Sequence, residues 1–200
     1  MGSDPAPFMA NLFLYYYENK FLKQYKLKNM KNARIFNFIF RFIDDLLAIN
    51  DEGLFEKNIK NIYPKELELK KGNVGHDQAS YLDIESKISN RQFSHKLYDK
   101  RDDFNFNIVR MPYLSNNMPS RIFYSSYSSE ILRIARCTSD KEDFLASCIS
   151  LIERMRRQGS KFMYNKARVS MHKVFCKHKS SFLPFFPTPK AFVDGILSFK

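Results

Sequence analysis

The stretch FNFIFRFIDDLLAIN at Phe36–Asn50 places two adjacent carboxylates, Asp44 and Asp45, between two apolar runs. The flanking residues are strand formers, so the sequence predicts a β-hairpin with both aspartates at its tip. Two ionised carboxylates repel each other unless a cation lies between them. Magnesium is commonly held by one or two carboxylates together with substrate phosphates, which makes the tip a candidate metal site. The alternative is an ordinary turn, where aspartate is common.

The net charge narrows the class of partner. The chain of 200 residues carries 33 Lys and Arg against 21 Asp and Glu, a formal net charge of +12. Such an excess favours a polyanion, either nucleic acid or an anionic membrane surface. The longest uncharged apolar run, Pro5–Tyr17, is shorter than the roughly 20 residues of a membrane-spanning helix, so we expect no membrane partner.

The cysteines indicate the compartment. Cys137, Cys148 and Cys176 are odd in number and form no CxxC motif. This usage predicts a reducing, intracellular location, in the nucleus or the cytoplasm, without a disulfide framework.

The segments around the hairpin predict an α+β fold. Phe8–Leu22 is apolar nearly all round a helix, so we expect a helix buried on most sides, followed by a polar loop over Lys23–Lys31. The hairpin strands are expected over Ile35–Phe42 and Leu46–Ile49.

A second set of elements follows the hairpin. Apolar spacing predicts a helix over Glu52–Tyr63, with Asp51 as its N-cap. A short strand at Leu67–Leu69 and a second hairpin from Tyr81–Ile88 and Gln92–Tyr98 complete an antiparallel sheet with helices on one face.

The second half of the chain reads as helices. Ser139–Glu142 matches a capping box, Gly159 is a helix stop, and Tyr164–His178 is a further helix. The apolar residues expected on buried helix faces are Phe123, Tyr127, Ile131, Ile134, Phe144, Cys148, Leu151, Ile152 and Met155. We therefore divide the chain into a mixed part (1–99), a connector (100–119), a helical part (120–179) and a Pro-punctuated tail (180–200) that the pattern does not place.

The FIDD sequence resembles the catalytic turn of reverse transcriptases, which has an aromatic residue, any residue and two aspartates. Gly2–Pro7 and the following Ala10–Phe13 resemble the family's Gly-rich loop and helix, which cradle the template and the incoming nucleotide. The residues that the resemblance assigns to this role are Gly2, Ser3, Pro5, Pro7, Asn11, Phe42 and Ile43.

Two later motifs extend the resemblance in the family's order and spacing. Leu67–Lys71 lies where the family carries a lysine that protonates the pyrophosphate leaving group, which implies Lys70 or Lys71 as general acid. The segment containing Tyr81, Leu82 and Asp83 resembles the element that grips the primer. The resemblance implies Mg²⁺ or Mn²⁺ at Asp44 and Asp45, a primed RNA or DNA template, and deoxynucleoside triphosphates.

The downstream region resembles reverse-transcriptase-like proteins of eukaryotic retroelements, with the Penelope-like group as the nearest in kind. The implied architecture is a partial polymerase palm followed by a helical thumb, and the resemblance covers about Met1 to His178. The arginines that a thumb would place on the phosphate backbone are Arg133, Arg136, Arg154, Arg156 and Arg157. The alternative for them is an ordinary solvated face.

One departure from the family affects activity. Its first catalytic carboxylate lies on a strand upstream of the Gly-rich loop, and this sequence begins at that loop. We therefore expect a fragment that is inactive by itself. The alternative function is a non-catalytic nucleic-acid-binding remnant of a retroelement.

Two weaker candidate sites remain. Asp102 and Asp103 adjoin Lys100 and Arg101 and are expected to form a solvated, ion-paired loop. The second candidate is a cluster whose spacing invites a zinc interpretation but whose interleaved lysines favour a basic helix face; it contains His172, Lys173, Cys176, Lys177, His178 and Lys179.

Overall fold

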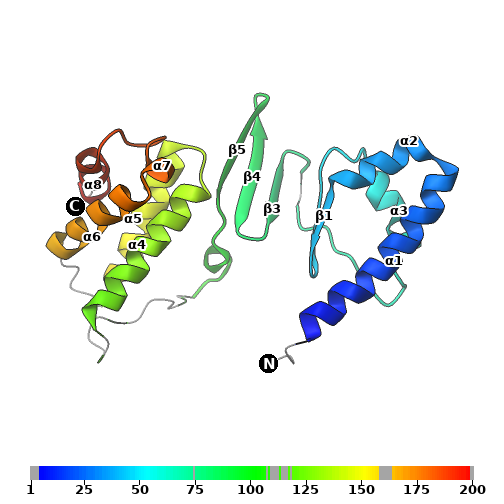
Figure 1. The fold of residues 1–200 in the computed structure, drawn as a ribbon, viewed down its shortest axis with the longest axis horizontal. Coiled ribbons are helices and arrows are strands. Elements are labelled where there is room, and N and C mark those ends of the chain that lie inside the picture. Colours follow the sequence, from blue (N-terminus) through cyan, green and yellow to red (C-terminus); the bar gives the residue numbers. More distant parts are fainter. Residues whose placement is uncertain are drawn as a thin grey trace. The chain divides into compact units, whose positions relative to one another are not determined.

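The computed structural model describes residues 5–73, 75–106, 108, 113, 117, 119–157 and 164–198. The chain has an α+β fold and divides into two compact units, Met1–Val74 and Gly75–Lys200 (Figure 1). The sequence placed its division at 100–119 instead. The sheet that precedes that stretch packs with the helices that follow it, because Leu97 lies against their core and the backbone N–H of Ser139 donates to the carbonyl of His95 at 2.8 Å.

The first unit combines helices with one hairpin. Its elements are α1 (Ala6–Lys28), α2 (Met30–Ala33), the 3₁₀ helix η1 (Arg34–Phe38), β1 (Ile39–Phe42), β2 (Asp45–Ala48) and α3 (Leu54–Ile62). β1 and β2 pair antiparallel, from Ile39 opposite Ala48 to Phe42 opposite Asp45. The predicted hairpin is thus confirmed, although Asp45 begins the second strand instead of lying in the turn.

The predicted first strand was too long at its start. Residues Arg34–Phe38 form η1 because the Phe36 ring packs against α1, with ring centroids 5.4 Å from those of both Phe21 and Tyr25. The same contacts explain why α1 continues to Lys28, where a loop was expected from Lys23. Lys26 and Lys28 in its last turn also interact favourably with the negative end of the helix dipole.

The expectation that α1 is buried on most sides is wrong. None of its described residues is fully buried. Only Leu14 and Phe21 pack against the small core of Phe55, Ile62 and Tyr63, because α3 and the hairpin cover one side of the helix. The large apolar side chains that stay exposed on α1 include Phe8, Met9, Leu12, Phe13, Tyr15 and Tyr16.

The N-cap of α3 differs from the prediction. The helix begins at Leu54 with Gly53, at φ 71°, as its N-cap in place of Asp51. Asp51 still supports the first turn, because its Oδ2 atom accepts a hydrogen bond from the Phe55 backbone N–H at 3.0 Å. The strand predicted at Leu67–Leu69 is wrong, since residues 64–73 contain neither helix nor strand. Both leucines are exposed there and pair with no strand in the described part of the unit.

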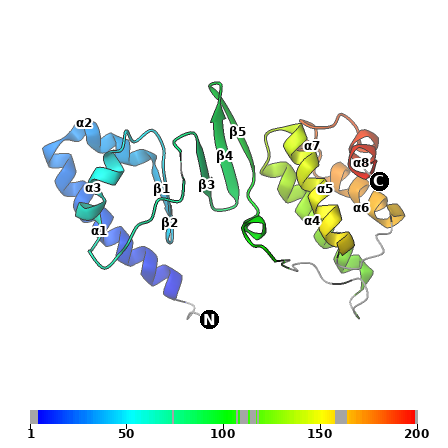
Figure 2. The ribbon, with the colours of Figure 1, turned by 180° about the vertical axis from the view of Figure 1, so that it is seen from behind.

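The second unit joins a three-stranded antiparallel sheet to a group of helices (Figure 2). Its elements are β3 (Gln78–Tyr81), β4 (Ile84–Ser89), β5 (Gln92–Leu97), η2 (Lys100–Asp103), α4 (Ser120–Arg136), α5 (Lys141–Arg157), α6 (Tyr164–Lys177), α7 (Lys179–Phe182) and α8 (Pro189–Leu197). The hairpin of β4 and β5 is confirmed. The strand expected over Tyr81–Ile88 is instead split by a tight turn, where Leu82 adopts φ 56°.

The predicted cap of α5 shifts by one residue. Asp140, not Ser139, caps the helix, because its Oδ1 accepts from the backbone N–H of Glu142 at 2.7 Å. Ser139 instead bonds to the backbone of His95 on β5. α6 ends at Lys177, as predicted to within one residue. Gly159 lies outside the described residues.

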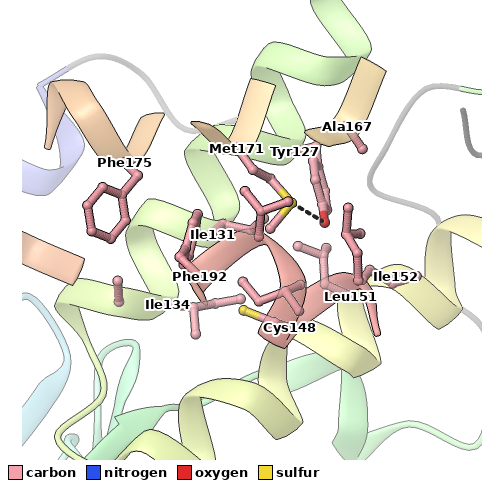
Figure 3. Close-up of a cluster of buried hydrophobic side chains, with 14 of the residues drawn as sticks. Tyr127, Ile131, Ile134, Cys148, Leu151, Ile152, Ala167, Met171, Phe175 and Phe192 are labelled. Carbon is pink, nitrogen blue, oxygen red and sulfur yellow. Dashed lines mark hydrogen bonds between the residues drawn. The ribbon is translucent and has the colours of Figure 1, made fainter. Parts of the chain in front are cut away.

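The core of the second unit includes the tail that the sequence left unplaced. All nine apolar residues expected on buried faces of α4 and α5 are buried, and Figure 3 shows most of them around Tyr127 and Met171. α8 begins with Thr188 as N-cap and Pro189 in the first turn, a signal that the sequence does carry. The buried residues from the tail are Phe182, Phe185, Phe186, Phe192, Val193, Ile196 and Leu197.

Candidate functional site

The Asp44–Asp45 tip stands on a strained turn. Ile43 and Asp44 form a two-residue connection between β1 and β2, and Ile43 adopts φ 54°. A β-branched residue with positive φ is a genuine outlier, which costs of the order of 1–3 kcal/mol and is typically found at functional sites. Asp44 is exposed and Asp45 is half-buried, so both carboxylates are accessible from solvent.

Arg41 fastens this turn to α1. Its Nε donates to Glu18 Oε1 at 2.7 Å, and its Nη1 donates to Asn11 Oδ1 at 2.7 Å and to the carbonyl of Ile43 at 3.2 Å. The guanidinium therefore bridges two turns of α1 and the hairpin tip. Because Glu18 already neutralises Arg41, this charge does not substitute for a cation at the two aspartates.

Tyr63 completes the network from the end of α3. Its hydroxyl donates to Glu18 Oε1 at 2.7 Å. Burial, together with the hydrogen bond and negative charge of Glu18, raises the pKa of Tyr63 well above its ordinary value. The phenol thus stays protonated and remains a donor across the physiological pH range.

The first testable prediction concerns Glu18. In Glu18→Gln we expect the first unit to lose about 1–2 kcal/mol of stability, because charge-assisted hydrogen bonds become neutral ones. Hydrogen exchange at the Ile49 amide, which donates to the Phe38 carbonyl beside β1, measures this loss. Alkaline titration should also find a lower Tyr63 pKa than in the wild type.

The matched control is Glu56→Gln. Glu56 forms an exposed ion pair with Lys71 at 2.8 Å, which is expected to contribute less than about 0.5 kcal/mol. Equal effects of the two substitutions would contradict a special role for the Glu18 network.

Asp45 shares one face of the hairpin with apolar side chains. Cross-strand pairing places Phe42 opposite Asp45 and Phe40 opposite Leu47, and paired residues lie on the same face of an antiparallel ribbon. Phe40 and Phe42 are largely exposed, whereas Ile39 and Leu46 on the other face pack toward the core. The carboxylate of Asp45 therefore borders an open apolar surface.

Asp44 and Asp45 are neighbours in the sequence. In the described parts of the chain, no group of three or more His, Cys, Asp or Glu side chains is placed to hold a metal ion. Two neighbouring carboxylates nevertheless suit magnesium when substrate phosphates supply the remaining ligands. On this donor set, Asp44 and Asp45 fit a divalent ion that binds together with a nucleotide.

Of the other residues that the resemblance assigned to the nucleotide site, only some are described, and not all of those lie in a loop. Gly2 and Ser3 are not among the described residues. Pro5 precedes α1 and Pro7 lies in its first turn, so part of the expected loop is helical. Asn11 reaches the tip through its bond to Arg41.

The two lysines expected to act as general acid differ in their surroundings. Lys71 Nζ pairs with Glu56 Oε1. Lys70 is exposed, and no ion pair among the described residues involves it. Lys70 is therefore the freer proton donor of the two.

One residue of the expected primer grip, Asp83, forms an ion pair with Arg133, which was expected to contact the nucleic-acid backbone. Tyr81 ends β3, and Leu82 and Asp83 form the turn to β4. Asp83 Oδ2 binds Arg133 Nη2 of α4 at 2.7 Å, and Arg133 also contacts Glu130. Partial burial lowers the pKa of Arg133, but these two carboxylates outweigh it and raise the pKa, so the guanidinium is held within the protein.

The other arginines that were expected to contact the nucleic-acid backbone differ in their surroundings. Arg154 binds Asp99, and Arg156 contacts the hydroxyl and ring of Tyr164. Arg136 is exposed. Arg157 ends α5, but its side chain is not among those described.

Sequence reasoning missed Glu18 and Tyr63 as parts of the site. A signal for Glu18 was present, since Asn11 and Glu18 interrupt an apolar helix seven residues apart, on one face, and Arg41 interrupts an apolar strand. Tyr63 gave no such signal, because a tyrosine at the end of an amphipathic helix is ordinary.

Every helix among the described residues is too short or too polar to cross a lipid bilayer. No protein-family model matches the chain, and neither a curated protein nor a solved structure matches it.

Proposed function

We propose that this chain is part of an RNA-directed DNA polymerase in which Asp44 and Asp45 hold the divalent metal. The observation that carries the proposal is the hairpin tip, where two adjacent carboxylates follow the strained Ile43 on a turn fastened by Arg41. Strain of this kind persists only where the surrounding structure fixes it, and it clusters at sites of binding and catalysis.

In the proposed reaction, a primer 3′-hydroxyl loses its proton to solvent water, and its oxygen bonds to the α-phosphorus of a deoxynucleoside triphosphate. The bond between that phosphorus and the α,β-bridging oxygen breaks, which releases pyrophosphate. When bound, Mg²⁺ or Mn²⁺ would supply positive charge at the attacking and leaving oxygens. Asp44 and Asp45 would supply carboxylate oxygens to that ion, and the Arg41 network keeps their turn in position. Lys70 supplies the proton for pyrophosphate from an exposed ammonium.

The proposed metal site has two carboxylates among the described residues, Asp44 and Asp45. By resemblance, the reaction centre of the family also uses a third carboxylate. The open apolar face at Phe40 and Phe42 and the exposed face of α1 are surfaces on which further elements could pack. Because Asp44 and Asp45 by themselves leave the proposed metal short of that third ligand, we expect the purified chain to extend no primer; robust extension would contradict this.

The second testable prediction addresses the metal site directly. With a deoxynucleoside triphosphate present, Asp44→Asn/Asp45→Asn should weaken Mn²⁺ binding by more than about tenfold, because neutral amides replace both charged ligands. Electron paramagnetic resonance of Mn²⁺ measures the free and bound ion.

The matched control is the chain's other Asp–Asp pair. Asp102→Asn/Asp103→Asn removes the same charge from a segment rich in basic residues and should leave Mn²⁺ binding unchanged. If both double variants bind Mn²⁺ like the wild type, the proposed metal role of Asp44 and Asp45 fails.

A second candidate is a nucleic-acid-binding protein without chemistry. The observation that favours it is α6, which carries Lys166, Arg168, Lys173 and Lys177 but no acidic residue. This candidate predicts nucleic-acid binding by a chain whose Asp44 and Asp45 hold no Mn²⁺.

A further inference from the structure

One side of α6 carries a row of lysines. Lys166, Lys173 and Lys177 lie seven and four residues apart, which places them in one narrow sector of the helix, and all three are exposed. The opposite side of the helix is buried in the core through Ala167, Met171 and Phe175.

The positive charge of this row is not neutralised within the described structure. α6 has no Asp or Glu, and none of the ion pairs among the described residues includes Lys166, Lys173 or Lys177. The neighbouring Arg168 differs, because it binds Asp194 of α8 at 2.8 Å. Like charges gathered in this way repel one another, and a polyanion relieves that repulsion.

The packing of α6 decides between two kinds of polyanion. An amphipathic helix binds a membrane surface by inserting its apolar face, but the apolar face of α6 is already buried in the protein. Its outer face offers only Val169 as an exposed aliphatic residue. Binding to nucleic-acid phosphates needs cationic side chains but no exposed apolar surface. Charge complementarity therefore favours nucleic acid as the partner of α6.

The dimensions also suit a duplex. With a rise of about 1.5 Å per residue, the row spans about 16 Å from Lys166 to Lys177. Double-stranded DNA carries one negative charge per about 1.7 Å of its axis, so each lysine can meet a phosphate.

We propose that Lys166, Lys173 and Lys177 bind the phosphate backbone of a nucleic-acid duplex. The proposal rests on the proposed function, in that it identifies the surface that would hold the primer and template. It differs from the sequence expectation, which assigned this contact to arginines, two of which the structure engages with Asp83 and Asp99.

The test measures binding of the full chain to a short fluorescent DNA duplex by anisotropy. In Lys166→Gln/Lys173→Gln/Lys177→Gln we expect the slope of log K against log salt to shrink by about 2.7, since each phosphate contact contributes about 0.9. Between about 50 and 200 mM salt, the wild type should then lose about 40-fold more affinity than the variant. The triple Lys→Arg variant should keep the wild-type slope.

The matched control removes three exposed lysines of α1, Lys20, Lys23 and Lys26, in the same way. An equal loss of slope in this control would overturn the proposal, because net charge alone would then explain binding. Binding to phosphatidylserine vesicles without duplex binding would also overturn it, in favour of a membrane surface.

The two proposals fail independently. A chain that binds duplex through α6 but shows no Mn²⁺ binding at the tip would retain this inference and lose the polymerase function.

Discussion

Phe192→Ala is expected to lower the free energy of unfolding of the second unit by about 3–5 kcal/mol, the largest effect of any single change considered for this chain. Phe192 on α8 is fully buried, and truncation to alanine leaves a cavity that its rigid aromatic neighbours cannot fill. Ring centroids lie 4.7 Å away at Phe182, 5.4 Å at Phe175, 5.7 Å at Phe186 and 6.5 Å at Phe144.

Hydrogen exchange at backbone amides of α6 and α8 measures the loss within this unit. The control is Phe93→Ala on β5, which removes an equally large but mostly exposed ring and should cost less than about 0.5 kcal/mol. If protection of α8 survives Phe192→Ala, the tail is not part of the cooperative core.

Asp99→Asn is expected to cost about 2–4 kcal/mol at neutral pH, because two partly buried guanidinium groups lose the same carboxylate. Asp99 accepts from Arg101 Nε at 2.7 Å and from Arg154 of α5. Partial burial raises the pKa of Asp99, but the hydrogen bonds from both arginines outweigh it and hold the pKa well below its ordinary value.

The lowered pKa of Asp99 sets how the stability of the second unit depends on pH. A carboxyl whose pKa is lowered in the folded state stabilises the fold above its unfolded pKa and loses that contribution as the pH falls below about 4. The wild type and Asp99→Asn should therefore converge in stability under acid. The exposed Asp77→Asn serves as control, and a gap between wild type and Asp99→Asn that stays constant into acid would contradict the ion-pair explanation.

Local pattern was sufficient for elements whose cause lies within a few residues. The FIDD hairpin and the buried face of α5 depend on alternation and helical period, and the structure confirms both of them. Where the structure differs from the predicted element, a packing contact determines the local structure. The Phe36 ring packs against α1, and the first part of the predicted strand is therefore a 3₁₀ helix.

In the candidate site, too, local sequence accounts for some features and tertiary packing accounts for others. Residue order alone was enough to predict that two adjacent carboxylates lie at a hairpin turn, and it shows that the basic helix α6 has no acidic residue. Which charges form ion pairs with one another depends on the folded chain: Arg41 binds Glu18 across 23 residues of sequence, and Arg154 binds Asp99 across 55. Spacing along a chain fixes which face of a helix or strand a side chain occupies, but ion pairs depend on which faces meet after folding. For that reason the sequence predicted a nucleic-acid contact for Arg133 and Arg154, whereas the folded chain pairs them with Asp83 and Asp99.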